Sequence, residues 1–186
     1  MKASIFVGSL AAFAMGATMA MAESHADENP MVGGAAMFAD MNIIENAVNS
    51  ADHTTLVAAV QAAGLVDTLQ GEGPFTVFAP VNAAFDALPE GTVDTLLMDE
   101  NKDMLVKILT AHVVSGDISA ETIRVRAGDD GFYHMQTVSG DALSAQVQGR
   151  TIYIYDESGN AGRISIADVM QSNGVIHVVD TVLLPK

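Results

Sequence analysis

The carboxyl end of the chain carries a long apolar run, residues 175–184, which directly follows the pair Asn173-Gly174. An Asn-Gly pair between two β-branched runs predicts a tight hairpin in which both central residues adopt positive φ. Successive side chains of a strand point to opposite faces, and both faces of this run are apolar. The strand must therefore be buried on both sides.

Two ionisable residues, His177 and Asp180, lie on opposite faces of this run. A buried polar group without a hydrogen-bond partner costs a few kcal/mol, so each side chain needs a partner inside the fold. For Asp180, and for Asp168 before the hairpin, the simplest expectation is a buried carboxylate that accepts backbone N–H groups. The other interpretation is a functional cleft in which several of these groups converge.

A second block, TVFAPVNAAF, covers residues 76–85, about ninety residues upstream of the terminal run. The two blocks, with His112-Val113-Val114 and Gly73-Pro74-Phe75 between them, resemble the paired signatures of the fasciclin, or FAS1, domain family. The resemblance covers residues 42–186. It implies an α+β fold, namely a FAS1-type β-wedge of two sheets flanked by several short helices, in a single-domain exported protein of bacterial type.

The resemblance also selects candidate binding residues, which are the polar side chains at the family-motif positions. These are Asn82, His112, Asp168, Asn173, His177 and Asp180. Asn82 follows Pro80-Val81, so it is expected to act as the N-cap of a helix by accepting the N–H of Ala84 or Phe85. A direct ligand contact by Asn82 is the alternative.

His112 corresponds to the histidine of a central Tyr-His pair that contributes to adhesive contacts in animal members of the family. In this chain Ala111 stands in place of the tyrosine. Aromatic side chains dominate binding hot spots, so the integrin-type contact loses its anchor. His112 is expected to tie a strand to the core, with a role in binding as the alternative.

Hydrophobic periodicity divides the remaining chain into helices first and strands later. Period-3.6 patterns predict helices from Asn42 to Ile123, with Gly64 ending one of them. From Tyr133 onward, short alternating runs separated by turn residues predict a meander of strands. Helices followed by strands indicate an α+β fold independently of the resemblance.

The charge balance narrows the range of partners. The chain has 8 Lys and Arg against 23 Asp and Glu, a net charge of −15. This excess repels phosphate backbones and anionic lipid surfaces, which argues against nucleic-acid binding and favours cationic, neutral or metal-bridged partners. The sequence has no cysteine, so the fold must depend on packing and hydrogen bonds alone.

The first 22 residues have the organisation of a secretory signal peptide: Lys2, an apolar stretch, and the small-x-small site Ala20-Met21-Ala22. A membrane anchor is the alternative, although the stretch is short for one. Residues 23–41 mix Pro, Gly and Met without a clean period, so a flexible segment is expected, unless its methionines pack on the domain. The domain itself is assigned to residues 42–186. The mature protein should then be periplasmic or extracellular, without membrane insertion.

Cleavage after Ala22 would expose Glu23-Ser24-His25 as the new amino terminus. A free amine, two deprotonated amides and an imidazole can surround a square-planar Cu(II) or Ni(II) ion, so these three residues form a candidate metal site. The alternative is that histidine stands third by chance. No other cofactor is predicted.

The sequence contains no Gly-x-Ser-x-Gly elbow, His-Glu-x-x-His helix or Walker loop. A non-enzymatic binding module is therefore expected, and the resemblance implies adhesion between cells or to extracellular matrix or polysaccharide, with a cell-surface or matrix partner. The alternative is a periplasmic protein that binds a small ligand or a metal. A deep apolar pocket beside His112 or His177 would favour that alternative, and a flat hydrated surface there would favour adhesion.

Overall fold

The computed structural model describes residues 29–186. Its main sheet has seven strands in the order β4-β3-β9-β8-β7-β6-β5, and each neighbouring pair is antiparallel except β3 and β9. The strands of this sheet are β3 (Phe75–Pro80), β4 (Val113–Ser115), β5 (Phe132–Gln136), β6 (Ala142–Gln148), β7 (Thr151–Tyr155), β8 (Ala161–Gln171) and β9 (Gly174–Val179).

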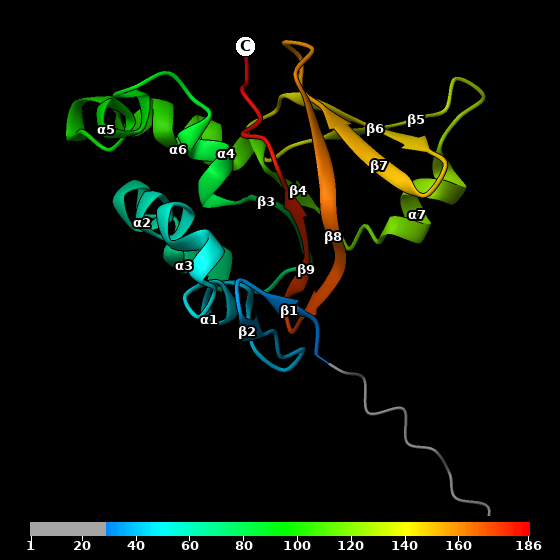
Figure 1. Ribbon diagram of the computed structural model, residues 1–186, viewed down its shortest axis with the longest axis horizontal. Coiled ribbons are helices and arrows are strands. Elements are labelled where there is room, and N and C mark those ends of the chain that lie inside the picture. Colours follow the sequence, from blue (N-terminus) through cyan, green and yellow to red (C-terminus); the bar gives the residue numbers. More distant parts are fainter. Residues whose placement is uncertain (1–28) are drawn as a thin grey trace, which may run out of the picture.

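Short helices cover one side of β3 and β9, whereas β5 to β7 and one further helix lie on the other side (Figure 1). The α+β prediction is thus confirmed. The α-helices are α1 (Ile43–Ala47), α2 (Thr54–Ala63), α3 (Val66–Gln70), α4 (Asn82–Asp86), α5 (Thr92–Leu96), α6 (Lys102–Ala111) and α7 (Ala120–Arg126), and 3₁₀ turns span Ala51–His53 and Asp99–Asn101.

The two sheets of the predicted wedge are joined through the long strand β8. Its first part pairs with β7 and its last part with β9, and the pairing register shifts between Ile164 and Val169. Such irregularities bend a strand and increase its twist, which turns β5 to β7 away from β3 and β4. Val114 of β4 also forms a bridge to Thr137, directly after β5, so the two halves meet again at their far edges.

The strand β9 separates two cores. Ile176 and Val178 pack in the helical core, between the sheet and α1 to α6. Val179 packs in the wedge core, between the two halves of the sheet. Every residue of β9 is buried, which confirms the prediction made from its two apolar faces.

The hairpin before β9 is present, but the predicted turn type is wrong. The two loop residues are Ser172 and Asn173, and neither has positive φ. Gly174 instead opens β9 with a φ of 156°, and a Cβ atom there would overlap the carbonyl oxygen of Phe75. The glycine is therefore required by the close approach of β9 to β3 rather than by the turn.

The described part of the expected flexible segment, residues 29–41, is packed on the domain. It forms a small ribbon, β1 (Met31–Val32) and β2 (Ala35–Ala36), closed by Gly33 and Gly34 with φ of 58° and 79°. Val32 and Met37 are buried in the helical core. Loose order is thus the wrong expectation here, and the alternative of packed methionines holds for Met37. The signal peptide and residues 23–28 lie outside the described residues.

Local helix signals are borne out. Asn42 caps α1, accepts the N–H groups of Ile44 and Glu45, and forms a reciprocal capping box with the Glu45 side chain. Gly64 ends α2 with a φ of 72°. In the part of the chain that the structure describes, no helix has the length and apolar character needed to cross a membrane.

Candidate functional site

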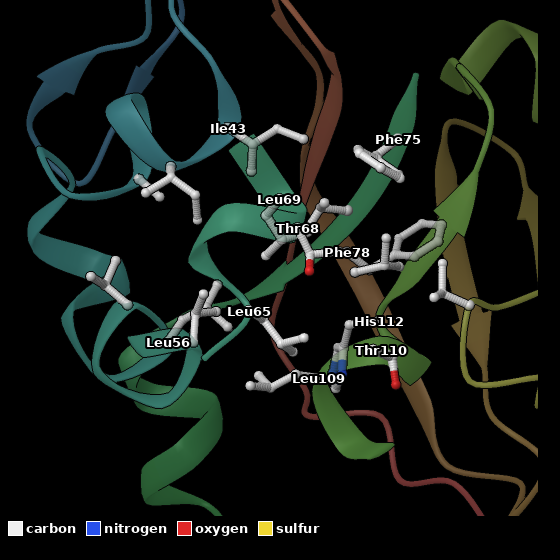
Figure 2. A pocket seen from close by; sticks show the side chains of 17 residues that line it. Ile43, Leu56, Leu65, Thr68, Leu69, Phe75, Phe78, Leu109, Thr110 and His112 are labelled. Atoms are coloured by element: carbon white, nitrogen blue, oxygen red, sulfur yellow. The ribbon is translucent and has the colours of Figure 1, made fainter. Parts of the chain in front are cut away.

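An apolar recess lies between α1, α2 and α3 on one side and β3, β4 and the end of α6 on the other (Figure 2). Its free volume is about 60 Å³. Aliphatic side chains make up most of its wall. The residues labelled in Figure 2 are Ile43, Leu56, Leu65, Thr68, Leu69, Phe75, Phe78, Leu109, Thr110 and His112.

The recess opens toward the surface. Thr68 and Val138 at its rim are exposed, and Leu65, Phe75 and Thr110 are half-buried. Both α1 and α3 have only five residues, so each covers the sheet with little more than one turn. Short helices that end in this way leave the space between them and β3 incompletely filled.

His112 lies on the wall of the recess, at the C-cap of α6. Its Nδ1 lies 2.8 Å from the Ile108 carbonyl oxygen, and the Leu183 N–H donates to Nε2 at 2.9 Å. These partners define the neutral tautomer with the proton on Nδ1. Burial lowers the pKa of His112 to about 4. Because both nitrogens are already bonded, the ring presents only its apolar surface to the recess.

His177 has an equivalent environment within β9. The Asp168 N–H donates to its Nδ1 at 3.2 Å, and its Nε2 lies 2.7 Å from the carbonyl oxygen of Ile118. The ring stacks on Phe78 with the centroids 5.6 Å apart. Burial lowers the pKa of His177, so it is a neutral histidine that ties β9 to β8 and to the segment before α7.

Asp168 and Asp180 accept backbone N–H groups as expected, but neither residue is buried. Asp168 accepts from Ala120 at 2.7 Å, and Asp180 accepts from Arg163 at 2.8 Å. Asp168 has a φ of 58° within the irregular part of β8. This backbone conformation turns its carboxylate outward to the first turn of α7, where an acceptor is favourable.

Asn82 is not the N-cap of α4, which corrects the expectation from sequence. Val81 occupies the cap position, and Asn82 is the first residue of the helix. The Asn82 side chain accepts the N–H of Thr55 at 3.0 Å and donates to the carbonyl of Ala51 at 2.8 Å. It therefore fastens α4 to the start of α2.

Asn173 performs a similar task at the β8–β9 turn. It accepts the N–H of Ile43 at 3.1 Å and donates to the carbonyls of Leu69 and Gly71 at 2.8 and 3.0 Å. The structure thus assigns structural contacts to all six candidate residues and does not bring them together in one cleft. Among them, His112 alone lines the recess.

Sequence reasoning missed His53, which is only 3% exposed. Its Nδ1 lies 2.8 Å from the Ser50 hydroxyl, and its Nε2 makes no hydrogen bond to any described residue. Burial lowers the pKa of His53. The ring faces a second hollow of about 30 Å³, which shares Ile43, Ala47, Leu56 and Val77 with the recess. A single histidine in a polar loop of the sequence gives no indication that its side chain will be buried.

Within residues 29–186 no group of three or more His, Cys, Asp or Glu side chains is arranged to hold a metal ion. The proposed Cu(II) or Ni(II) ligands Glu23, Ser24 and His25 lie outside the described residues, so that site stays a prediction.

The described residues thus form a wedge-shaped sheet, a cover of short helices and an apolar recess. The Fasciclin domain profile matches residues 51–185, and the chain belongs to the fasciclin family. The resemblance found in the sequence is thereby confirmed.

Sequence similarity to known relatives extends over most of the chain. Protein sll1483 of Synechocystis is 48% identical over 178 residues, which cover 95% of this chain and 92% of that protein. Immunogenic protein MPB70 of Mycobacterium bovis is 37% identical, with 75% and 66% covered. Cell surface glycolipoprotein MPB83 of the same species is 35% identical, with 87% and 69% covered.

A solved structure supports the fold directly. The FAS1 domain pair from the insect cell adhesion molecule fasciclin I superposes with a TM-score of 0.69 at 18% identity. The match covers 77% of this chain and 51% of the pair. At this identity the likeness concerns the fold.

Proposed function

We propose that the protein is an exported, non-enzymatic binding module that mediates adhesion between cells or to extracellular matrix or polysaccharide. The recess beside His112 has a free volume of only about 60 Å³, so it is not the deep pocket that would favour a small ligand. The observation that carries this proposal is that this small apolar recess reaches the surface, with a neutral, internally bonded His112 in its wall. The description of one relative as a cell-surface protein and of the solved structure as a cell adhesion molecule supports it.

The size of the recess fits one apolar side chain of a partner protein. A free volume of about 60 Å³ is well below the roughly 150 Å³ of a cavity that holds benzene. An aliphatic side chain inserted between Thr68 and Val138 would be desolvated on all sides. Such buried anchors dominate the energy of protein interfaces.

The recess also favours a second candidate function, the binding of a small apolar ligand in the periplasm. The specific observation is that the hollow beside His53 shares a wall with the recess. Outward rotation of Leu56 and Ile43 would join the two spaces, and the unpaired Nε2 of His53 would then offer one hydrogen bond to the ligand.

Attachment of the parent organism to cells and surfaces tests the first function. A deletion strain should attach less than the wild type, and purified mature protein should restore attachment. Thr68→Phe places a ring over the mouth of the recess and should not restore it. Gln61→Phe, at an exposed position of α2 outside the recess, is the matched control and should restore it fully.

The same variants separate the two functions. If deletion leaves attachment unchanged, adhesion is wrong. An increase in the melting temperature of wild type and Gln61→Phe under xenon pressure, absent from Thr68→Phe, would then support ligand binding.

A further inference from the structure

The β5–β6–β7 half of the sheet has an outer face, opposite to the wedge core. Alternate residues of these strands, among them Met135, Ala145 and Ile154, point into the wedge core. The opposite face carries aromatic rings together with amide and hydroxyl groups. We name as the aromatic face Phe132, His134, Ser144, Gln146, Tyr153 and Tyr155, all of which are half-buried or exposed.

Strand register brings these residues together across three strands. Phe132 pairs with Gln146, which pairs with Tyr153. His134 pairs with Ser144, which pairs with Tyr155. The face therefore consists of two adjacent cross-strand rows, in each of which aromatic rings flank a polar side chain on β6.

Phe132 contacts the rings of His134 and Tyr155. Phe132 stacks on His134 with centroids 6.1 Å apart and planes at 12°, and it meets the edge of Tyr155 at 5.7 Å. The Tyr155 hydroxyl donates to Oε1 of Gln146 at 3.1 Å, and Gln148 donates to the same oxygen at 2.6 Å. A face fixed in this way loses little side-chain entropy when a ligand binds.

Charged side chains lie at the edges of this face. Arg163 lies 3.4 Å from Asp180, and His134 lies 3.4 Å from Asp130. The backbone N–H of Phe132, and then His134, lower the pKa of Asp130, which therefore stays ionised. None of the six residues that define the aromatic face is Asp, Glu, Lys or Arg, although the chain has a net charge of −15. A neutral ligand avoids the repulsion that a polyanion would meet.

We propose that the aromatic face binds a neutral polysaccharide. Sugar rings have apolar C–H faces that stack on aromatic rings, and their hydroxyl groups both donate and accept, as the amides of Gln146 and Gln148 do. Strands lie about 4.8 Å apart, so β5 to β7 provides a platform about 10 Å wide for a short run of sugar units. This inference deepens the proposed function by naming one partner class, and its surface is separate from the recess.

A protein partner is the competing occupant, because Tyr and Arg are also enriched at protein interfaces. The cores of those interfaces are apolar, whereas here glutamine or serine lies on β6 between the β5 and β7 residues of each row. The alternation of ring and amide favours the sugar.

Affinity electrophoresis of the mature protein tests the proposal, with gels that contain dextran, glucomannan, a soluble β-1,3-glucan or alginate. At least one of the gels with a neutral polysaccharide should retard the protein, and the alginate gel should not retard it. Tyr153→Ala should weaken retardation about tenfold, the value of one stacked ring, whereas Tyr153→Phe keeps the ring and should stay within about threefold of wild type.

Circular dichroism and the melting temperature establish that Tyr153→Ala is folded, and Gln146→Leu gives a second variant that removes amide hydrogen bonds while keeping the rings. Absence of retardation in all three neutral gels would overturn the proposal, as would binding to alginate alone or binding that survives both Tyr153→Ala and Gln146→Leu. Thr68→Phe should be retarded like wild type, so failure of the recess and failure of the aromatic face are distinguishable.

Discussion

The two cores on either side of β9 differ in how completely they are filled. In the wedge core, Phe78, Ile123, Ala145, Ile154, Val179 and Leu183 are all 0% exposed. In the helical core, Val169 alone reaches that value, and the hollow beside His53 and most of the recess lie among its residues. The same strand thus has a tightly packed face and a loosely packed one.

The difference follows from the elements that cover each face. Strands of the wedge continue one hydrogen-bonded ladder, so their side chains meet at regular spacing. The helical cover consists largely of five-residue helices whose ends leave gaps. Binding capacity therefore lies inside the loosely packed side, whereas the well-packed side is suited to present a rigid outer surface.

The largest expected effect comes from disrupting the pairing of β9 with β3, because β9 lies between the two cores. Gly174→Ala should cost at least about 4 kcal/mol, because its Cβ would overlap the Phe75 backbone and force β9 from β3. Gly140→Ala is the control, since its φ is 92° but nothing lies within 4 Å, and it should cost only about 1–2 kcal/mol of backbone strain. Urea unfolding measures both, and equal effects would contradict the close approach.

Matched truncations compare the two cores directly. Ile154→Ala in the wedge core should lower the free energy of unfolding by about 4 kcal/mol, because its tightly packed neighbours cannot collapse into the void. Ile44→Ala, beside the existing recess, should cost about 2–3 kcal/mol, because fewer contacts are lost. Chemical denaturation at neutral pH measures the two values. The comparison fails if Ile44→Ala costs as much as Ile154→Ala.

Acid should destabilise both cores through their neutral histidines. Between pH 6.5 and about 4 the unfolded chain protonates His112 while the fold does not, so stability falls as pH decreases through this window. His112 alone should contribute about 3 kcal/mol. His177 and His53 shift in the same direction and add to the loss.

Urea unfolding at steps between pH 7 and 4 measures this dependence. A flat profile above pH 4.5 would mean that the buried rings become protonated inside the fold.

The sequence predicts features whose causes are local. The period-2 pattern of β9 and the helix end at Gly64 depend on neighbours a few positions away, and both are confirmed. The role of Asn82 could not be found in this way, because its partners Thr55 and Ala51 lie 27 and 31 residues away. Asn173 acts across still longer separations.

The recess was beyond prediction for the same reason. It is formed by parts of several separate elements, and none of its residues differs from an ordinary core residue in the sequence. The aromatic face could be predicted from the sequence only in part. Its alternation is visible in the sequence, but only the register of β5 to β7 places Phe132 against Tyr155.

The substitution with the smallest expected effect tests whether the free volume in the helical core can accept added atoms. Ala145→Leu inserts three carbons into a site that is 0% exposed and should cost about 1–3 kcal/mol, because its neighbours must leave their rotamers. Ala47→Leu enlarges a half-buried side chain that borders both hollows, so the added atoms enter free space and stability should change by less than about 1 kcal/mol. Melting temperatures at neutral pH measure both variants. If Ala47→Leu is as damaging as Ala145→Leu, the hollows are not available space, and the recess cannot receive a partner's side chain without rearrangement of α1 and α2.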